Sequence, residues 1–394
     1  MKTLIKNCRI ITPFEVVDGY CITLAGTTIS GLIPEAWTCT ADYDQVLDCK
    51  EYYAAPGFID LHNHGNSGYD VMDATPQALE AIAEFHLKSG VTGFLAATIT
   101  QEKKEITAAI KNIVSFAKTQ KSGGVQKTPG SRLLGIYLEG PYFSPKRKGA
   151  QAAEYLKTPD CAELEDFLEL AENHLKVVAL APELPGAVEA VNYLKKKGIT
   201  VAAGHTDATY DQIRQAVEEG TTLATHLFNG MRGFTHREPG PPGALLLEER
   251  VSCELICDGI HLHPAAVDLV VRLKGPSGVV LISDAMRATG LGDGHFTLGG
   301  QDVLVSDGIA RLTSNQRALA GSTLTLDRAV YNVMTMAKLP IEDAVRMATY
   351  NPAQVIGVAE RRGSIEPGKA GEIVVFDEQV RIKHVIIDGE ILSF

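Results

Sequence analysis

Several polar segments of this 394-residue chain contain the residue types that bind divalent metals. His62 and His64 are separated by one residue, so in an extended segment both side chains point the same way. Glu139, His205 and His226 follow in separate segments. Imidazole nitrogens and carboxylate oxygens are ligands that Zn²⁺ and Fe²⁺ accept without cysteine. Together these residues predict a site for one or two divalent ions, with a buried hydrogen-bonded histidine network as the alternative.

A hydrolytic metal site also needs a group that moves protons, and Asp284 is the candidate. A divalent ion lowers the pKa of water from about 15.7 to about 7. A neighbouring carboxylate can accept the proton of that water as it attacks a substrate. Asp284 alone would be explained more simply as a helix N-cap. Beside the candidate ligands, it predicts a general base and acid.

The elements that must position these residues alternate between strand-like and helix-like segments, which is typical of parallel βα units. Helix-like stretches follow most of the apolar runs. We predict an α/β fold, a (β/α)₈ TIM-type barrel, whose active site lies at the carboxyl ends of the strands. A doubly wound open sheet is the alternative, but the chain has neither an early GxGxxG segment nor a P-loop. The eight predicted strands are Gly57–Leu61, Val91–Ala97, Leu133–Leu138, Lys176–Leu180, Thr200–Ala203, Leu223–Thr225, Cys253–Cys257 and Val279–Ile282.

Both ends of the chain are rich in short β segments separated by turns. Asp388-Gly389, for example, is a hairpin signal near the C-terminus. We therefore predict that residues 1–53 and 360–394 together form a small β-sandwich domain, and that residues 54–359 form the barrel.

Composition limits the class of protein. With 45% hydrophobic and 22% charged residues, the chain has the composition of an ordinary folded protein. Its net charge of -11 argues against a general partner in nucleic acid or an anionic membrane. The seven cysteines include no CxxC pair, and no apolar run suits a signal peptide or a membrane span. We expect a cytoplasmic protein.

The motifs resemble a known group of enzymes. The segment PGFIDLHNHG at 56–65, with His205, His226 and Asp284, resembles the amidohydrolase superfamily. Closer similarity is to N-acetylglucosamine-6-phosphate deacetylases, in the segments LEGP (138–141), THLFNGM (225–231), REPG (237–240), DGIH (258–261) and LAGS (319–322). The resemblance spans essentially the whole chain. It implies a metal-dependent hydrolase that releases acetate from N-acetyl-D-glucosamine 6-phosphate in amino-sugar catabolism and cell-wall sugar recycling.

The resemblance also implies roles for the candidate metal and catalytic residues. Asp284 corresponds to the catalytic acid and base, and His261 to a histidine near the sugar and the reacting carbonyl. The cofactor implied is Zn or Fe, one or two ions per subunit. The implied ligands are those of the shared site, followed by the pair that supports a second ion in some members: Glu139, His205 and His226, then His62 and His64.

The substrate implied by the resemblance is a small phosphorylated amino sugar. Asn229, the backbone of Gly230, and Arg237 correspond to phosphate-binding residues, with Arg237 reaching the partner's site in a homodimer. Gln151 stands where the family often has a sugar-contacting His. This difference keeps N-acetylgalactosamine 6-phosphate open as the substrate. The remaining substrate-binding residues are His261, Leu319 and Ala320.

Two further alternatives remain at this point. Another amidohydrolase would act on an unphosphorylated amide and would use different specificity loops. A catalytically inactive barrel would serve as an interaction scaffold and would need no metal. Metal analysis and a comparison of phosphorylated with unphosphorylated sugars distinguish these possibilities.

Overall fold

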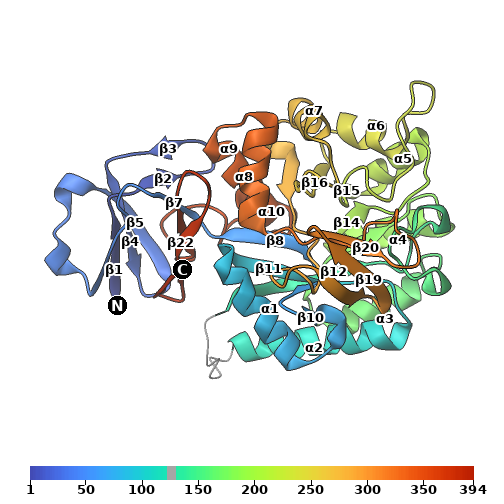
Figure 1. Cartoon of the computed structure of the whole chain (residues 1–394), viewed down its shortest axis with the longest axis horizontal. Coiled ribbons are helices and arrows are strands. Elements are labelled where there is room, and N and C mark those ends of the chain that lie inside the picture. The colour runs from blue at the N-terminus through green and yellow to red at the C-terminus, as the bar shows by residue number, and fades with distance from the viewer. Residues whose placement is uncertain (122–129) are drawn as a thin grey trace.

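Eight parallel strands form the central barrel of the computed structural model, which describes residues 1–121 and 130–394 (Figure 1). Each barrel strand pairs with the barrel strand that follows it in the sequence. Ala285, just beyond the last strand, forms a parallel bridge with Asn63 at the end of the first strand, which closes the barrel at its carboxyl end. This arrangement confirms the barrel prediction, and the doubly wound alternative is wrong. The strands are β8 (Phe58–Asn63), β11 (Val91–Thr98), β12 (Arg132–Glu139), β13 (Leu175–Leu180), β14 (Thr200–Ala203), β15 (Thr221–Ala224), β16 (Ser252–Leu255) and β17 (Val279–Leu281).

The barrel strands are apolar because both of their faces are covered. Every residue of β11, for example, is buried. Helices pack around the outside, as the helix-like stretches after most of the apolar runs predicted (Figure 1). The helices are α1 (Pro76–Lys88), α2 (Lys103–Lys121), α3 (Cys161–Ala171), α4 (Ala187–Lys196), α5 (Tyr210–Glu219), α6 (Gly240–Leu247), α7 (Pro264–Lys274), α8 (Leu326–Ala337), α9 (Ile341–Ala348) and α10 (Tyr350–Val355).

Helix α5 illustrates how the sequence forms these elements. Thr209 accepts the backbone N–H of Gln212, and the Gln212 side chain bonds back to the backbone of Thr209, a capping box that starts the helix. Ile213, Ala216 and Val217 recur at helical spacing and are buried. The helix ends at Gly220. Similar apolar stripes attach the other helices to the barrel.

The two chain ends meet in one sheet, and the β-sandwich domain expected from them stays a prediction. Strand β7 (Tyr53–Pro56) pairs antiparallel with β21 (Ile373–Phe376). The same six-stranded sheet contains β2 (Arg9–Ile11), β3 (Val16–Val17), β22 (Ile382–Ile387) and β23 (Glu390–Ser393). A second sheet contains β1 (Lys2–Lys6), β4 (Tyr20–Ala25), β5 (Thr28–Pro34) and β6 (Gln45–Asp48). Ile5 and Ile22 of the second sheet share a hydrophobic cluster with Ile373 of the first. The domain boundaries at 53/54 and 359/360 stay a prediction.

A three-stranded antiparallel sheet lies between β17 and α8 and was not predicted. It consists of β18 (Gly294–Leu298), β19 (Gln301–Ser306) and β20 (Ile309–Leu312). Gly299-Gly300 and Asp307-Gly308 form its two turns, and all four residues have positive φ. Both dipeptides are the hairpin signals that could have revealed this sheet. The short pair β9 (Gly65–Asn66) and β10 (Tyr69–Asp70) completes the strands of the described residues.

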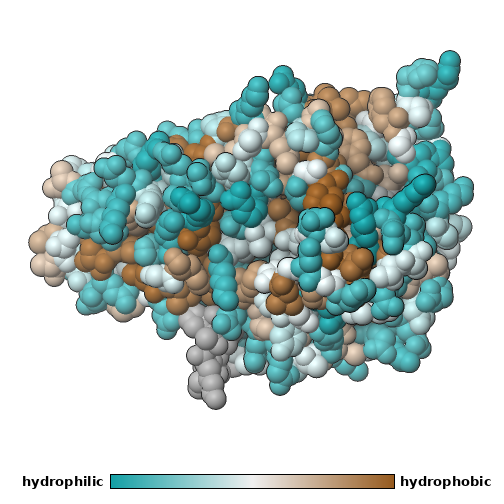
Figure 2. Space-filling view, in the orientation of Figure 1, coloured by the Kyte–Doolittle hydropathy of each residue, from teal (hydrophilic) through white to brown (hydrophobic). Residues whose placement is uncertain are grey.

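The surface is mainly hydrophilic, with hydrophobic residues gathered over α6 and α7 at the top of the view (Figure 2). Leu247, Leu269 and Leu273 of these helices are exposed by 66%, 49% and 50%. In the part of the chain that is described, no helix combines the length and the apolar character that crossing a membrane requires.

Candidate metal centre and active site

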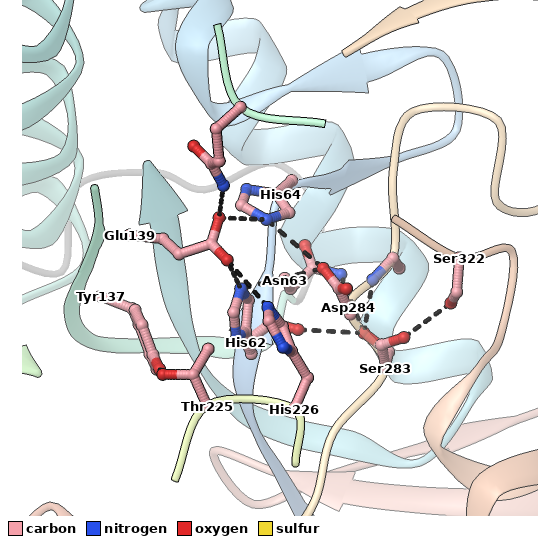
Figure 3. Close-up of polar contacts among 12 residues, drawn as sticks. His62, Asn63, His64, Tyr137, Glu139, Thr225, His226, Ser283, Asp284 and Ser322 are labelled. Carbon is pink, nitrogen blue, oxygen red and sulfur yellow. Dashed lines mark hydrogen bonds and ion pairs between the residues drawn. The ribbon is translucent and has the colours of Figure 1, made fainter. Parts of the chain in front are cut away.

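The candidate metal ligands converge at one end of the barrel. His62 and His64 lie at and just beyond the end of β8, and Glu139 is the last residue of β12. His205 follows β14, and His226 follows β15. The carboxyl ends of parallel barrel strands surround one opening, so these residues face one another although they are far apart in sequence. Figure 3 shows this for His62, His64, Glu139 and His226.

Three of the site residues occupy a strained backbone region. The φ angles of His205, His226 and Asp284 are 45°, 28° and 48°. Residues other than glycine rarely adopt this left-handed conformation, which costs about 1–3 kcal/mol each. The backbone of Asp284 is held where the barrel closes, because its N–H donates to the His62 carbonyl at 2.9 Å. Such strain is found where surrounding structure fixes a functional side chain.

The first group of ligands contains Glu139, His205 and His226, all buried. Glu139 Oε1 lies 3.3 Å from His205 Nε2 and 3.2 Å from His226 Nε2. The ligand atoms of the three residues all lie within 4.8 Å of one another. The sequence prediction that these three residues share one site is therefore consistent with the geometry.

The second group contains His62, His64 and Asp284, which meet the same distance limit. Asp284 Oδ1 lies 3.4 Å from His64 Nε2 and 3.8 Å from His62 Nε2. Glu139 stands between the groups, because its Oε1 is 3.6 Å from His62 Nε2 and its Oε2 is 3.4 Å from His64 Nε2. This placement suits a carboxylate that contacts two ions.

The outer ring nitrogens of two histidines are held by backbone carbonyls. His205 Nδ1–H donates to the Arg147 carbonyl at 2.9 Å, and His226 Nδ1–H donates to the Asn229 carbonyl at 3.2 Å. When the ring is neutral, its lone pair is therefore on Nε2, which faces Glu139, as in metal-ligating histidines. A lone pair that faces a carboxylate is stabilised when a proton or a metal cation lies between them. The chemistry and burial of these donors therefore fit a divalent ion.

The charges of the site shift its pKa values strongly. Burial alone would lower the pKa of His64, but its hydrogen bonds to Asp284 and Glu139 raise that pKa well above the usual value. For His226, burial is likewise opposed by Glu139, and the pKa rises to about 9. Burial acts to raise the pKa of Glu139, but the surrounding histidines hold it well below its ordinary range. The pKa of Asp284 is lowered for the same reason.

His261 is oriented by a carboxylate that sequence reasoning did not assign. Its Nδ1–H donates to Asp258 Oδ2 at 2.7 Å, and the backbone N–H groups of Ile260 and His261 donate to Asp258 Oδ1 at 2.8 Å. The hydrogen bonds of His261 outweigh burial and lower the pKa of Asp258. His261 lines the cavity, and because Nδ1 is bonded to Asp258, Nε2 is the ring nitrogen available to a substrate.

A cavity of about 270 Å³ opens above the two ligand groups. Most sequence-predicted site residues line it: His64, Glu139, Gln151, His205, His226, Asn229, Gly230, His261, Asp284 and Leu319. His62 and Ala320 are buried and do not line the cavity. Ala320 belongs to the hydrophobic cluster that includes the apolar residues of the β18–β20 sheet. Arg237 is exposed on the loop before α6 and does not line the cavity. Arg317, which sequence reasoning missed, does.

Gln151 is held at both ends of its amide group. Its Nε2 donates to Glu139 Oε2 at 2.7 Å, and its Oε1 accepts the Thr100 N–H at 3.0 Å. The side chain thus supports Glu139 as well as lining the cavity. Gly230 has a positive φ of 61°, and a Cβ there would lie 2.7 Å from His205 Nδ1. Glycine therefore fits this position without displacing the His205 ring.

The sequence of this chain is similar to known proteins. Residues 53–392 match the model of the Amidohydrolase family. The chain belongs to this family. It is 42% identical over 337 residues to the N-acetylglucosamine-6-phosphate deacetylase of Vibrio furnissii, covering 86% of this chain and 82% of that relative. It is also 38% identical over 394 residues to the N-acetylgalactosamine-6-phosphate deacetylase of Escherichia coli O157:H7, with both chains covered completely.

The fold of this amidohydrolase is similar to solved structures as well. A variant of the N-acetyl-D-glucosamine-6-phosphate deacetylase of Mycobacterium smegmatis, in complex with N-acetyl-D-glucosamine-6-phosphate, superimposes with a TM-score of 0.91. The two chains are 31% identical, and both are covered completely. The resemblance seen in the sequence motifs is confirmed.

Proposed function

We propose that this amidohydrolase cleaves the acetamide of N-acetyl-D-glucosamine 6-phosphate with one water molecule, giving acetate and D-glucosamine 6-phosphate. The observation that carries the proposal is the position of Asp284. Its carboxylate lies 3.4 Å from His64 Nε2, lines the cavity, and adjoins both groups of candidate ligands. The deacetylases among the relatives supply the substrate class.

A Zn or Fe ion would be held by Glu139, His205 and His226, and a second ion by His62, His64 and Asp284. Such an ion supplies Lewis acidity, which lowers the pKa of water and polarises an amide carbonyl. Both metals accept these ligands, so availability decides between them.

The chain's own residues then move the protons. Asp284 accepts the proton of the attacking water while the new carbon–oxygen bond forms. It returns this proton to the sugar nitrogen as the carbon–nitrogen bond breaks, so the amine can leave. His261, held by Asp258 at 2.7 Å, directs its Nε2 toward the carbonyl oxygen or a neighbouring sugar hydroxyl.

The phosphate would be bound at the loop that follows β15. Asn229 and Gly230 line the cavity, and the Gly230 backbone N–H suits a phosphate oxygen. Arg237 is exposed outside the cavity, which supports a contact with the substrate of a second subunit. Helices α6 and α7 follow this loop in the chain, and their exposed leucines form an apolar surface that a homodimer would bury.

N-acetyl-D-galactosamine 6-phosphate is the second candidate substrate. The relative that matches all 394 residues bears the name of a deacetylase of that sugar phosphate. The two sugars differ only in the orientation of one hydroxyl group. Gln151 lines the cavity and is our candidate for the residue that distinguishes the two sugars.

Acetate release tests the proposal. The purified protein is supplied with each of the two sugar phosphates and with unphosphorylated N-acetylglucosamine, and its metal content is measured in parallel. We expect the highest kcat/KM with N-acetyl-D-glucosamine 6-phosphate and about one or two equivalents of Zn or Fe. A higher value with the galactosamine epimer would favour the second candidate. No acetate from either phosphate would refute both.

A further inference from the structure

Glu254 is a fully buried carboxylate that the proposed chemistry does not use. It lies on β16 beneath the metal centre and has no exposed surface. An unneutralised charge in such a position costs several kcal/mol, so its retention requires a reason. The neighbouring strand residues Cys253 and Leu255 are apolar core residues.

One oxygen of Glu254 acts as a hydrogen-bond acceptor. The backbone N–H of His226 donates to Oε2 at 3.2 Å, and the Tyr137 hydroxyl lies 3.4 Å from the same atom. His62 Nδ1 also lies 3.4 Å from Oε2. Because a backbone N–H can only donate, Oε2 accepts, and His62 Nδ1 carries the proton that it donates there.

This hydrogen bond determines what His62 presents to the metal centre. With the proton on Nδ1, the neutral ring has a lone pair on Nε2. That Nε2 is buried and has no hydrogen-bond partner among the described residues. It lies 3.6 Å from Glu139 Oε1 and 3.8 Å from Asp284 Oδ1. Three acceptors thus face one another, an arrangement that a cation between them would stabilise.

We propose that Glu254 is a positioning residue for a second divalent ion, held by His62, His64 and Asp284. It fixes the tautomer and orientation of His62, and its negative charge increases the basicity of that ring. Glu254 Oε1 is buried without a partner among the described residues, so its charge is balanced better when the nearby site holds a cation. The inference rests on the metal-dependent function proposed above.

Ion binding without any sugar tests this role. The apoprotein is titrated with Zn²⁺ by calorimetry, and bound metal is counted by elemental analysis. We expect two equivalents for the wild-type protein. Glu254→Gln keeps the shape of the side chain but removes its charge. It should retain one tightly bound ion, and the dissociation constant of the other should rise by about 10- to 100-fold.

Tyr137→Phe is the matched control. It removes another donor to the same carboxylate oxygen but keeps the ring that packs against His62, with centroids 4.4 Å apart. This variant should bind both ions with wild-type affinity. Wild-type affinity for both ions in Glu254→Gln would overturn the proposal, as would a second ion weakened equally in Tyr137→Phe.

His62→Gln keeps the inference testable if Glu254→Gln does not fold. It should lose the same ion, and a His62→Gln protein that still binds two ions tightly would overturn the proposal. A wild-type protein that binds only one ion would do so too. Two ions bound as expected, with no acetate released from a sugar phosphate, would support this inference and contradict only the proposed function.

Discussion

His86 should make this protein lose stability as the pH falls below 6.5. The residue lies on α1, is 3% exposed, and packs against Phe94 with ring centroids 4.8 Å apart. Its Nε2 has no hydrogen-bond partner among the described residues. Burial lowers the pKa of His86 to about 3, against an ordinary value of 6.5.

The sign of the effect follows from proton binding. The folded-state pKa is below the unfolded-state value, so the unfolded chain binds an extra proton between about pH 6.5 and pH 3. The contribution of His86 to stability is therefore fully present above pH 6.5 and declines as the pH falls. Linkage with these two pKa values gives a loss of about 2 kcal/mol between pH 7 and pH 5.

Urea unfolding of the apoprotein at pH 7 and pH 5 measures this loss. We expect His86→Leu to reduce the pH-dependent loss of unfolding free energy by about 2 kcal/mol relative to wild type. Leu87→Ala on the same helix is the control, because it removes a buried side chain and no titrating group. It should cost about 2–5 kcal/mol at both pH values. Equal pH dependence in wild type and His86→Leu would refute the reasoning.

Three further predictions concern the active site. Asp284→Asn should lower kcat for acetate release by about 10²- to 10⁴-fold while elemental analysis still finds the ion held by the Glu139 group; near-normal turnover would reject its proton-transfer role. Arg237→Ala should raise KM for the phosphorylated sugar about tenfold and leave that for the unphosphorylated sugar unchanged; equal effects would argue against a phosphate contact. Gln151→Leu removes the amide that donates to Glu139 at 2.7 Å and adds no charge, so calorimetry should show about tenfold weaker Zn²⁺ binding, and unchanged affinity would contradict the supporting role of Gln151.

The barrel was predictable because its signals are local. Apolar runs such as Val91–Thr98 mark strands buried on both faces, and the amphipathic stretch of α5 has its own start and stop residues. Parallel strands expose their carboxyl ends at one rim, so the polar residues after each strand could be assigned to one site from the sequence. The hairpin signals Gly299-Gly300 and Asp307-Gly308 are equally local and are sufficient to predict the sheet that they connect.

The sequence by itself determined the residue types of the metal centre and the strand ends that carry them. Only the tertiary structure decided which atoms meet: that Glu139 stands between two ligand groups, and that Gln151 bonds to it. The contact of His62 with Glu254 spans 192 residues. It exists because the barrel closes on itself, and no local pattern of side chains records how a closed sheet brings distant strands together.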